Sequence, residues 1–579
     1  MITEGEESLL ATVQFDSARW QAQSEWESAL LGPHGLRLPE WIERGQAAVV
    51  KRGAHRTVYR VELPPGSFYV KHYHGRSAAD RGKHLLRASP ARREFNKTKE
   101  IARRGLPAAR PLAVGEARRG GLIAESYFVS AELQGARPLS EFLFEIVPSL
   151  PPREQATIRR ALTERLAELC GAMHEAGVWQ NDLHLGNILV RDCAATANEP
   201  HLRPPRLELF LIDVPGVRFS PPLGWRRSRD SLAMLLAGLR ERTTRTERWR
   251  FWRRYLEARP RLALPGPLRV ALDELDTAAW RHAHRIVASR DKRCVRDNRD
   301  FYQLRRPGMT ACAVEDLPRE LLAKLAADPE SPIREARHAP IKISHSSVVV
   351  RTELELAGGP VTAAYKRSRV KSPAKRLLAP LRQSRALKGW RLGHALLQRG
   401  ISTARPLCVI EPSRGRDAWL ATEWIEGAQN LHLYLWDLAT RSGRERAARA
   451  MQCAAALGRL IGRMHGWRIS HRDLKACNLV AVERADDVQV SIIDLDGVEL
   501  RRRSSAANRA SDLARLATSM TMHSWLGDSA RLRFLKSYLR SLYFGAPSDA
   551  CELRELWHAV APLSESKRTQ MARAGKRVA

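Results

Sequence analysis

Hydrophobic and polar residues alternate in two short segments near the N-terminal end of the chain, and this pattern predicts a pair of β-strands. Residues 57–61 and 67–72 flank Pro64-Pro65-Gly66, which is a strong turn signal. Residues 91–104 instead form a charged amphipathic segment, which Gly105 and then a proline bring to an end. That segment predicts a helix that packs on the strands.

A second group of elements follows in the same half of the chain. Residues 158–176 carry apolar side chains at helical spacing and predict a long helix. Residues 188–190 and 207–212 are short apolar segments separated by a polar loop, and they predict two strands. The second half repeats this order, with strands predicted over residues 346–356, 361–366, 479–482 and 488–493 and helices over 386–399 and 447–465.

The repeat is also visible in the residues themselves. The segment RGLPAARPL begins at Arg104, and RGISTARPL begins 295 residues later at Arg399. Each segment is followed at similar distances by Met-His, by an Asp-x-x-x-x-Asn motif and by a strand that ends in Asp. A period of this length indicates duplicated domains and excludes a solenoid of short repeats.

The repeated polar residues fit phosphoryl transfer. An Asp followed by Asn on a loop supplies a base for the acceptor hydroxyl and an oxygen ligand for a metal, and a second Asp after the next strand supplies the main metal ligand. A lysine on an earlier strand binds the nucleotide phosphates, and an acid on the following helix holds that lysine. In the first half these residues are Asp182, Asn187, Asp213, Lys71 and Glu94.

The second half carries most of the same set. Asp473 lies in the motif His-Arg-Asp-Leu-Lys, in which Lys475 is suited to stabilising the transferred phosphoryl group. Asn478 and Asp494 are the expected metal ligands, and Lys366 is the expected phosphate ligand.

The first half resembles the lipopolysaccharide kinase (Kdo/WaaP) family of the protein kinase-like superfamily. The resemblance is carried by the segments Arg52 to Leu63 and Tyr69 to Tyr73 and by the helix that runs into Arg104. It covers most of residues 48–300 and, more loosely, 340–545. It implies an α+β fold of two tandem bilobal domains, each with an antiparallel N-lobe sheet and a mostly helical C-lobe.

The resemblance also implies cofactors, site residues and an activity. ATP and Mg²⁺ are the expected cofactors, with Lys71 on the phosphates, Glu94 paired with it, Asp182 as base, and Asn187 and Asp213 on magnesium. The implied activity is transfer of phosphate to a sugar hydroxyl of lipopolysaccharide core or a related glycolipid. The expected boundaries are a lead-in over 1–45, kinase-like domains over 46–308 and 339–560, a connector over 309–338 and a basic tail over 561–579.

The halves depart from the family pattern in different ways. The usual His-Arg-Asp is Gln180-Asn181-Asp182 in the first half, as in small-molecule kinases. In the second half Gly389 stands where Glu94 does, and no acid occurs from Arg367 to Gln398. We therefore expect the first half to be the active unit and the second to be weak or inactive.

The loops expected to cover the phosphates depart from the pattern in both halves. Gly53 is the only glycine in the first loop, and the second loop, residues 344–347, has none. Small side chains there would still let backbone amides approach phosphate.

Composition limits the setting. The chain has 579 residues and a formal net charge of +34, which favours anionic partners such as a glycolipid or the cytoplasmic face of the inner membrane. The eight cysteines form no CxxC pair, and the first 20 residues have no apolar signal segment, so a cytoplasmic location is expected. The Arg-rich segment 226–254 is interpreted as a helix with Trp249 and Trp252 packed inward, and no nucleic-acid reading module is present, so nucleic acid is not an expected partner.

Two other functions are consistent with the same residues. One is a protein kinase, with the second half active through its His-Arg-Asp motif. The other is a tandem pseudokinase scaffold that binds nucleotide or an anionic partner without turnover.

Overall fold

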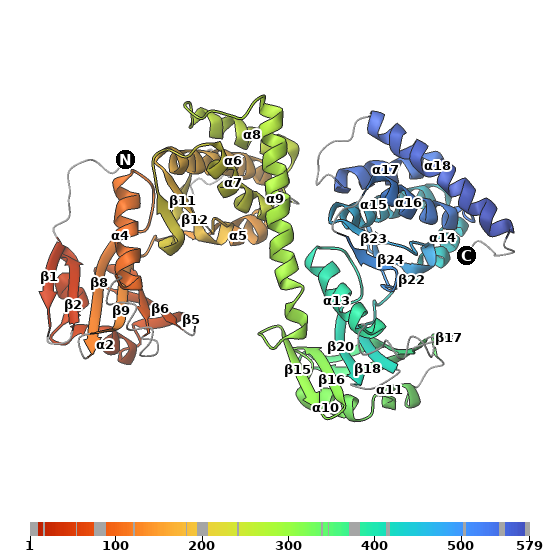
Figure 1. Ribbon diagram of the computed structural model, residues 1–579, viewed down its shortest axis with the longest axis horizontal. Coiled ribbons are helices and arrows are strands. Elements are labelled where there is room, and N and C mark those ends of the chain that lie inside the picture. Colours follow the sequence, from red (N-terminus) through yellow and green to blue (C-terminus); the bar gives the residue numbers. More distant parts are fainter. Residues whose placement is uncertain are drawn as a thin grey trace. The chain divides into compact units, whose positions relative to one another are not determined.

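The computed structural model describes residues 10–15, 18–53, 55–74, 88–119, 122–180, 182–193, 206–239, 242–336, 340–344, 347–369, 383–412, 417–501, 505–542 and 550–573. The chain forms two compact units, Met1–His282 and Ala283–Ala579. Figure 1 shows a sheet and a group of helices in each unit. Each unit is described by itself.

The first unit begins with a seven-stranded antiparallel sheet of order β1-β2-β8-β9-β7-β6-β5. Its strands are β1 (Leu10–Gln14), β2 (Ala18–Gln23), β5 (Ala47–Arg52), β6 (Arg56–Leu63), β7 (Gly66–Tyr73), β8 (Pro111–Arg119) and β9 (Leu122–Ala131). The short elements β3 (Leu31–Gly32), β4 (Gly35–Leu36), α1 (Glu27–Leu30) and α2 (Leu38–Glu43) lie between β2 and β5 along the chain.

Helix α4 (Pro90–Arg103) packs on this sheet where the sequence predicts a helix. Ser89 caps its N-terminus by accepting a hydrogen bond from the backbone N–H of Arg92 at 3.1 Å, and Pro90 occupies the first turn. Gly105 follows the helix with φ 71°, a left-handed conformation that glycine adopts without strain. The buried face of α4 carries Phe95 and, unusually, Glu94.

The rest of the first unit is mainly helical, with a three-stranded sheet, β10-β12-β13, and a two-stranded sheet, β11-β14. The elements are β10 (Arg137–Pro138), α5 (Leu139–Glu141), α6 (Pro152–Glu175), β11 (Val178–Gln180), β12 (Ile188–Asp192), β13 (Leu207–Leu211), β14 (Val217–Phe219), α7 (Trp225–Leu239), α8 (Arg245–Glu257) and α9 (Leu268–Arg290), the last of which continues into the second unit. Trp252 on α8 is buried as expected, but Trp249 is 52% exposed, so the expectation that both rings pack inward was wrong for Trp249.

The second unit repeats the sheet strand for strand, in the order β15-β16-β20-β21-β19-β18-β17. Its strands are β15 (Phe301–Arg306), β16 (Met309–Val314), β17 (Lys342–Ser344), β18 (Ser347–Leu356), β19 (Gly359–Arg369), β20 (Pro406–Pro412) and β21 (Asp417–Glu423). Helix α13 (Arg385–Gln398) packs on β20 and β21 as α4 packs on β8 and β9. Two short helices, α10 (Arg319–Ala327) and α11 (Ser331–Arg334), lie between β16 and β17 along the chain.

The helical part of the second unit again includes two small sheets, β22-β24-β25 and β23-β26. Its elements are β22 (Gln429–Asn430), α14 (Leu431–Thr440), α15 (Gly443–Gly466), β23 (Ile469–His471), β24 (Leu479–Glu483), β25 (Val488–Ile492), β26 (Val498–Leu500), α16 (Ala506–Met520), α17 (Asp528–Leu542) and α18 (Ala550–Arg573).

The expected boundaries need three corrections. The described part of the lead-in 1–45 includes β2, which pairs with β8, so it is part of the first sheet. The expected connector 309–338 begins inside the β15–β16 hairpin, whose β16 pairs with β20, so it belongs to the second sheet. Residues 561–573 continue α18, where Ser564 O accepts a hydrogen bond from Thr518 on α16, so they are not a detached tail.

The lead-in is held to the first sheet by Trp20, which is 2% exposed and stacks on Tyr127 with ring centroids 5.5 Å apart. A Cβ atom on Gly115 would lie 2.3 Å from the Trp20 indole, so only glycine leaves room for that ring. Trp20 therefore fills a site that the sheet is shaped to accept.

We expect Trp20→Ala to destabilise the first unit by about 3–5 kcal/mol, because it removes a fully buried indole and leaves a cavity. Thermal and urea unfolding of the full chain measure the loss. Trp249→Ala is the matched control and should change stability by less than about 0.5 kcal/mol. Equal effects of the two substitutions would contradict the placement of Trp20 in the sheet core.

Candidate active site

In the first unit a lysine and two carboxylates from three separate elements converge. Lys71 on β7 donates to Glu94 Oε1 on α4 at 2.5 Å, and its Nζ lies 3.7 Å from Oδ1 of Asp213, which follows β13. The Glu94 side chain is 1% exposed, that of Lys71 16% and that of Asp213 41%. The exposure of the three side chains therefore increases from the buried Glu94 to Asp213, whose carboxylate is open to solvent.

Two further residues complete this charge network. The Tyr73 hydroxyl donates to Glu94 Oε2, and burial raises the pKa of that hydroxyl, which keeps it a donor. Arg56 on β6 donates to Asp213 Oδ1 at 3.4 Å. Because a buried carboxylate is tolerated only when it is paired and hydrogen-bonded, Lys71 and Tyr73 are what allow Glu94 to lie inside the fold. Neither Tyr73 nor Arg56 was singled out from the sequence.

Asp213 is held in an unusual backbone conformation. Its φ and ψ are 53° and 58°, in the left-handed region, and its carbonyl accepts a hydrogen bond from Gln180 Nε2 at 3.0 Å. Such conformations cost free energy outside glycine and persist where the surrounding contacts enforce them. Burial tends to raise the pKa of Asp213, but the charges of Lys71 and Arg56 outweigh it and hold this pKa below its usual value. The carboxylate is thus kept ionised.

Asp182 and Asn187 lie on the loop between β11 and β12. Asn187 Nδ2 donates to the Asp182 carbonyl at 2.9 Å, which fixes the loop and leaves the amide oxygen Oδ1 without a donor among the described residues. The Asp182 carboxylate is 78% exposed, and His184 Nε2 lies 3.7 Å from its Oδ2. A base for an incoming hydroxyl needs such access.

Magnesium fits this part of the site. Asp213 and Asn187 provide oxygen atoms, which Mg²⁺ prefers, and the remaining ligands of such ions in kinases are phosphate oxygens and water. Within the ranges that the structure describes, no group of three His, Cys, Asp or Glu side chains is gathered to hold a metal by itself.

Gly53 lies at the turn between β5 and β6, where its N–H donates to the Arg56 carbonyl at 2.9 Å. A Cβ atom there would make only an ordinary contact at 3.5 Å. Its role near phosphate stays a prediction. In the second unit Ser344 Oγ closes the equivalent turn by accepting from Ser347 N at 3.1 Å, while residues 345 and 346 lie outside the described residues.

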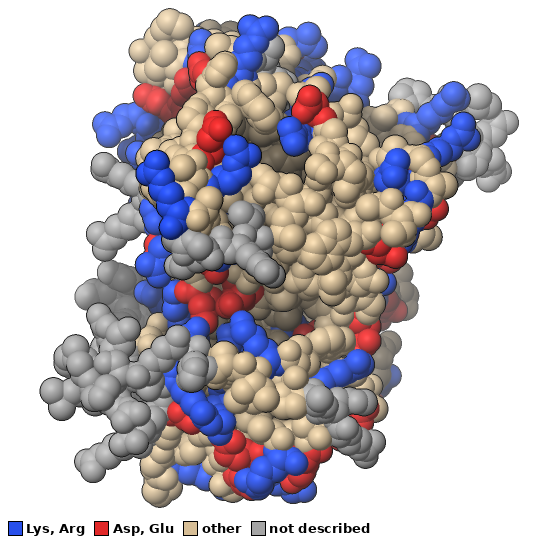
Figure 2. Space-filling model, turned by 90° about the vertical axis from the view of Figure 1, so that its right-hand side faces the viewer, with Lys and Arg blue, Asp and Glu red and all other residues tan. Residues whose placement is uncertain are grey.

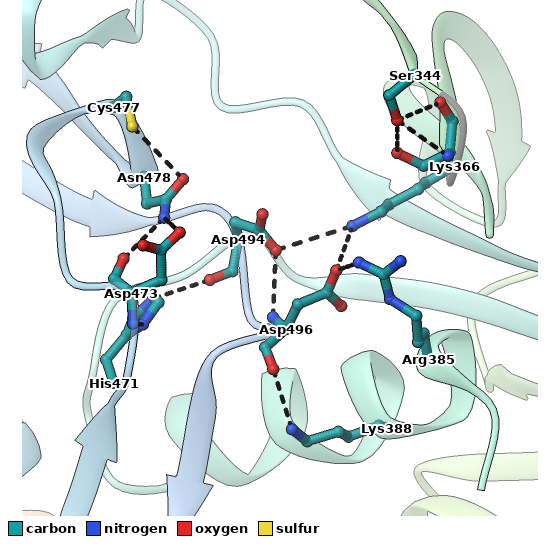
Figure 3. A network of polar contacts seen from close by, with 11 residues as sticks. Ser344, Lys366, Arg385, Lys388, His471, Asp473, Cys477, Asn478, Asp494 and Asp496 are labelled. Atoms are coloured by element: carbon teal, nitrogen blue, oxygen red, sulfur yellow. Dashed lines mark hydrogen bonds and ion pairs between the residues drawn. The ribbon is translucent and has the colours of Figure 1, made fainter. Parts of the chain in front are cut away.

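The second unit brings its predicted loop residues together closely. Lys475 Nζ lies 3.0 Å from Asp473 Oδ1, and Asn478 Nδ2 donates to the carbonyl of Asp473 at 2.8 Å. His471 Nδ1 accepts from the Asp473 N–H at 3.2 Å, and its Nε2 lies 3.0 Å from the Asp494 carbonyl. Figure 3 shows His471 between the loop that carries Asp473 and the loop that carries Asp494. Burial tends to raise the pKa of Asp473, but Lys475 outweighs it and holds this pKa below its usual value.

The missing helix acid does not leave Lys366 without an ionic partner. Its Nζ lies 3.8 Å from Asp494 Oδ1 and 3.6 Å from Oδ2 of Asp496, a residue that the sequence analysis did not identify as a site residue (Figure 3). Helix α13 supplies no acid, as the sequence shows, but the loop after β25, which carries Asp494 and Asp496, does. The available signal was the Asp-x-Asp spacing of Asp494 and Asp496.

The sequence analysis also did not identify a buried acid that contacts the segment leading to Asp473. Asp512 on α16 is 2% exposed and accepts from Ser470 Oγ at 2.6 Å and from the His471 N–H at 3.0 Å. The first unit has Ser231 at the matching place, where its Oγ lies 3.0 Å from His174 Nε2. A charged acceptor therefore holds Ser470 and His471 ahead of Asp473 in the second unit, whereas the residue at the matching place in the first unit is a neutral serine.

Comparison with known proteins agrees with this geometry. The model of the lipopolysaccharide kinase (Kdo/WaaP) family matches residues 41–255 and 358–538, which together are more than half of the chain. The chain belongs to the lipopolysaccharide kinase (Kdo/WaaP) family. The match falls separately on the two units, so each carries the family's sequence pattern.

Individual relatives match a single unit's length of chain. Lipopolysaccharide core heptose(I) kinase WaaP of Pseudomonas aeruginosa is 26% identical over 246 residues, which cover 42% of this chain and 86% of the relative. The protein of the same name from Escherichia coli is 22% identical over 225 residues, 38% of this chain and 81% of the relative. A solved structure, WaaP in complex with acyl carrier protein, matches at 21% identity with a TM-score of 0.34, covering 46% of this chain and 99% of that one.

No helix among the described residues is long and apolar enough to cross a bilayer. On the face drawn in Figure 2, basic side chains lie in several groups interspersed with acidic and neutral ones.

We expect Glu94→Gln to lower phosphate transfer by the first unit by about tenfold to a hundredfold, because Lys71 loses a charged hydrogen-bond acceptor worth about 1.5–3 kcal/mol. The assay uses a chain that also carries Asp473→Ala, so that only the first site turns over. Lys99→Gln, at an exposed position of the same helix, is the control and should retain the parent rate. Unchanged transfer in Glu94→Gln would show that the Lys71–Glu94 pair is not needed.

Proposed function

We propose that this protein is an ATP- and Mg²⁺-dependent phosphotransferase that phosphorylates a sugar hydroxyl of lipopolysaccharide core or a related glycolipid, and that its first unit is an active centre. The convergence of Lys71, Glu94 and Asp213 carries the proposal, because three elements far apart in sequence place one cation and two carboxylates where a kinase needs them. The named relatives are core heptose(I) kinases, which supports the choice of acceptor class.

Each residue has a defined task in this reaction. Lys71, oriented by Glu94, binds nucleotide phosphate oxygens, and Asp213 and Asn187 hold Mg²⁺, which neutralises phosphate charge when bound. Asp182 accepts the proton of the acceptor hydroxyl as the bond from oxygen to phosphorus forms and the bond to ADP breaks. Its exposure suits a large acceptor that approaches from solvent.

We further propose that each unit is a bilobal kinase-like domain and that the chain works at the cytoplasmic face of the inner membrane as a peripheral protein. The identical strand order of the two large sheets supports the first point. A net charge of +34 supports the second, since basic proteins are attracted to anionic lipid surfaces. The same charge would concentrate the protein near an anionic glycolipid acceptor.

The test is incorporation of labelled phosphate from ATP into isolated cell-envelope glycolipid. In a chain that carries Asp473→Ala, adding Asp182→Ala should lower incorporation at least about a hundredfold, because the loss of a general base costs 10²–10⁴. Adding Asp276→Ala instead, an exposed substitution on α9, should leave incorporation unchanged.

Two results would contradict the proposal. Labelled phosphate found in protein and absent from glycolipid would identify a protein kinase. Binding of ATP with no Asp182-dependent transfer to any acceptor would identify a scaffold.

A further inference from the structure

The second unit lacks the helix acid that holds the lysine in the first unit, and a neighbouring side chain takes up the space that such an acid would need. Gly389 occupies the place of Glu94 on the equivalent helix. A Cβ atom on Gly389 would lie 2.9 Å from Leu420 Cδ2, so no larger side chain fits unless Leu420 moves. A partner for Lys366 has to come from another element.

Asp496 provides that partner from the metal loop. Its Oδ2 lies 3.6 Å from Lys366 Nζ, and its own position is fixed by Arg385, which donates to the same oxygen, and by Lys388, which donates to its carbonyl at 3.1 Å. The Asp496 N–H donates to Asp494 Oδ1 at 3.1 Å, so the residue also orients the predicted metal ligand (Figure 3). Four contacts therefore converge on one side chain and its peptide.

The first unit shows that this loop position is structurally equivalent in both halves. Pro215 occupies it there, two residues after Asp213, and the Pro215 carbonyl accepts from Lys97 on α4 at 2.5 Å, much as the Asp496 carbonyl accepts from Lys388 on α13. Proline has no carboxylate, and the first unit has Glu94 to hold its lysine. In each unit the lysine is therefore paired with one acid in addition to the predicted metal ligand. This acid is Glu94 on helix α4 in the first unit and Asp496 on the loop after β25 in the second.

The remaining parts of the second site are in place. Asp473, Lys475 and Asn478 contact one another, and buried Asp512 fixes the backbone of the loop that carries them.

We propose that the second unit is a second ATP-binding phosphotransfer centre, in which Asp496 is the positioning residue for Lys366. This inference rests on the kinase activity proposed above and extends it to the unit that lacks the helix acid. Phosphate passes from ATP to an acceptor hydroxyl, Asp473 takes the hydroxyl proton and ADP leaves. Lys366 is held by the metal loop itself, so its position does not depend on a carboxylate from α13.

The experiment measures ATP binding at saturating Mg²⁺ by equilibrium dialysis, on full-length protein whose first site is removed by Lys71→Met with Asp213→Ala. We expect one ATP per chain to remain. Adding Asp496→Asn should weaken this binding about tenfold or more, as expected for the loss of one charged contact. Asp496→Glu, which keeps the carboxylate, should restore most of the affinity.

Asp486→Asn is the matched control, because it makes the same change at an exposed turn between β24 and β25 and should bind ATP as the parent does. The first-site-deleted chain should also transfer phosphate to glycolipid, and Asp473→Ala should abolish that transfer while ATP stays bound. Lys366→Met gives an independent measure of the site if Asp496→Asn disturbs folding, which thermal unfolding would reveal.

Absence of ATP binding in the first-site-deleted chain, or binding without Asp473-dependent transfer, would overturn the second centre. Equal affinity of Asp496→Asn and the parent would overturn the role of Asp496. A variant that only needs more Mg²⁺, with unchanged affinity for ATP at saturation, would make Asp496 a metal ligand and would also overturn that role. None of these results would affect transfer by the first unit, which is measured separately in the Asp473→Ala chain.

Discussion

The buried pairing of Lys71 with Glu94 is the interaction on which the first site depends. A carboxylate that is 1% exposed must be neutralised, and removal of one partner from a buried ion pair typically costs about 3–5 kcal/mol. The strand that carries Lys71 and the helix that carries Glu94 are therefore fixed relative to each other. Asp213 completes the arrangement from a third element: its Oδ1 lies 3.7 Å from Lys71 Nζ, and its side chain is 41% exposed.

The second unit has the same strand order, but its lysine is paired with acids from a different element. Its lysine is held by Asp494 and Asp496 on the loop after β25, and Leu420 Cδ2 lies 2.9 Å from where a Cβ atom at position 389 would be. Its catalytic loop rests on the buried carboxylate of Asp512, where the first unit has Ser231. The two units thus share the strand order of the large sheet and differ in which residues neutralise their buried charges.

Much of this was predictable because local signals and the repeat agree. Alternation around the Pro64-Pro65-Gly66 turn predicted β6 and β7, and the capped amphipathic segment predicted α4. The order of Lys71, Glu94, Asp182, Asn187 and Asp213 predicted a kinase-like site, and the structure brings Lys71, Glu94 and Asp213 together and joins Asp182 to Asn187.

Other features depend on contacts between distant segments and have no local pattern. The strands β1 and β2 join the first sheet through the pairing of β2 with β8, and β15 and β16 join the second sheet through the pairing of β16 with β20. In the sequence Asp496 stands out only by its Asp-x-Asp spacing from Asp494, and Asp512 is an ordinary acid. The contacts of these two residues with Lys366 and Ser470 appear only in the folded structure. Such long-range pairings are what sequence periodicity cannot specify.

The most direct test of the central claim is a crystal structure of the full chain with Mg²⁺ and a non-hydrolysable ATP analogue. The account predicts that Lys71 contacts the nucleotide phosphates while still paired with Glu94, and that the metal lies between Asp213 and Asn187. A first unit without nucleotide beside Lys71, or with nucleotide bound there and the Lys71–Glu94 pair broken, would contradict it.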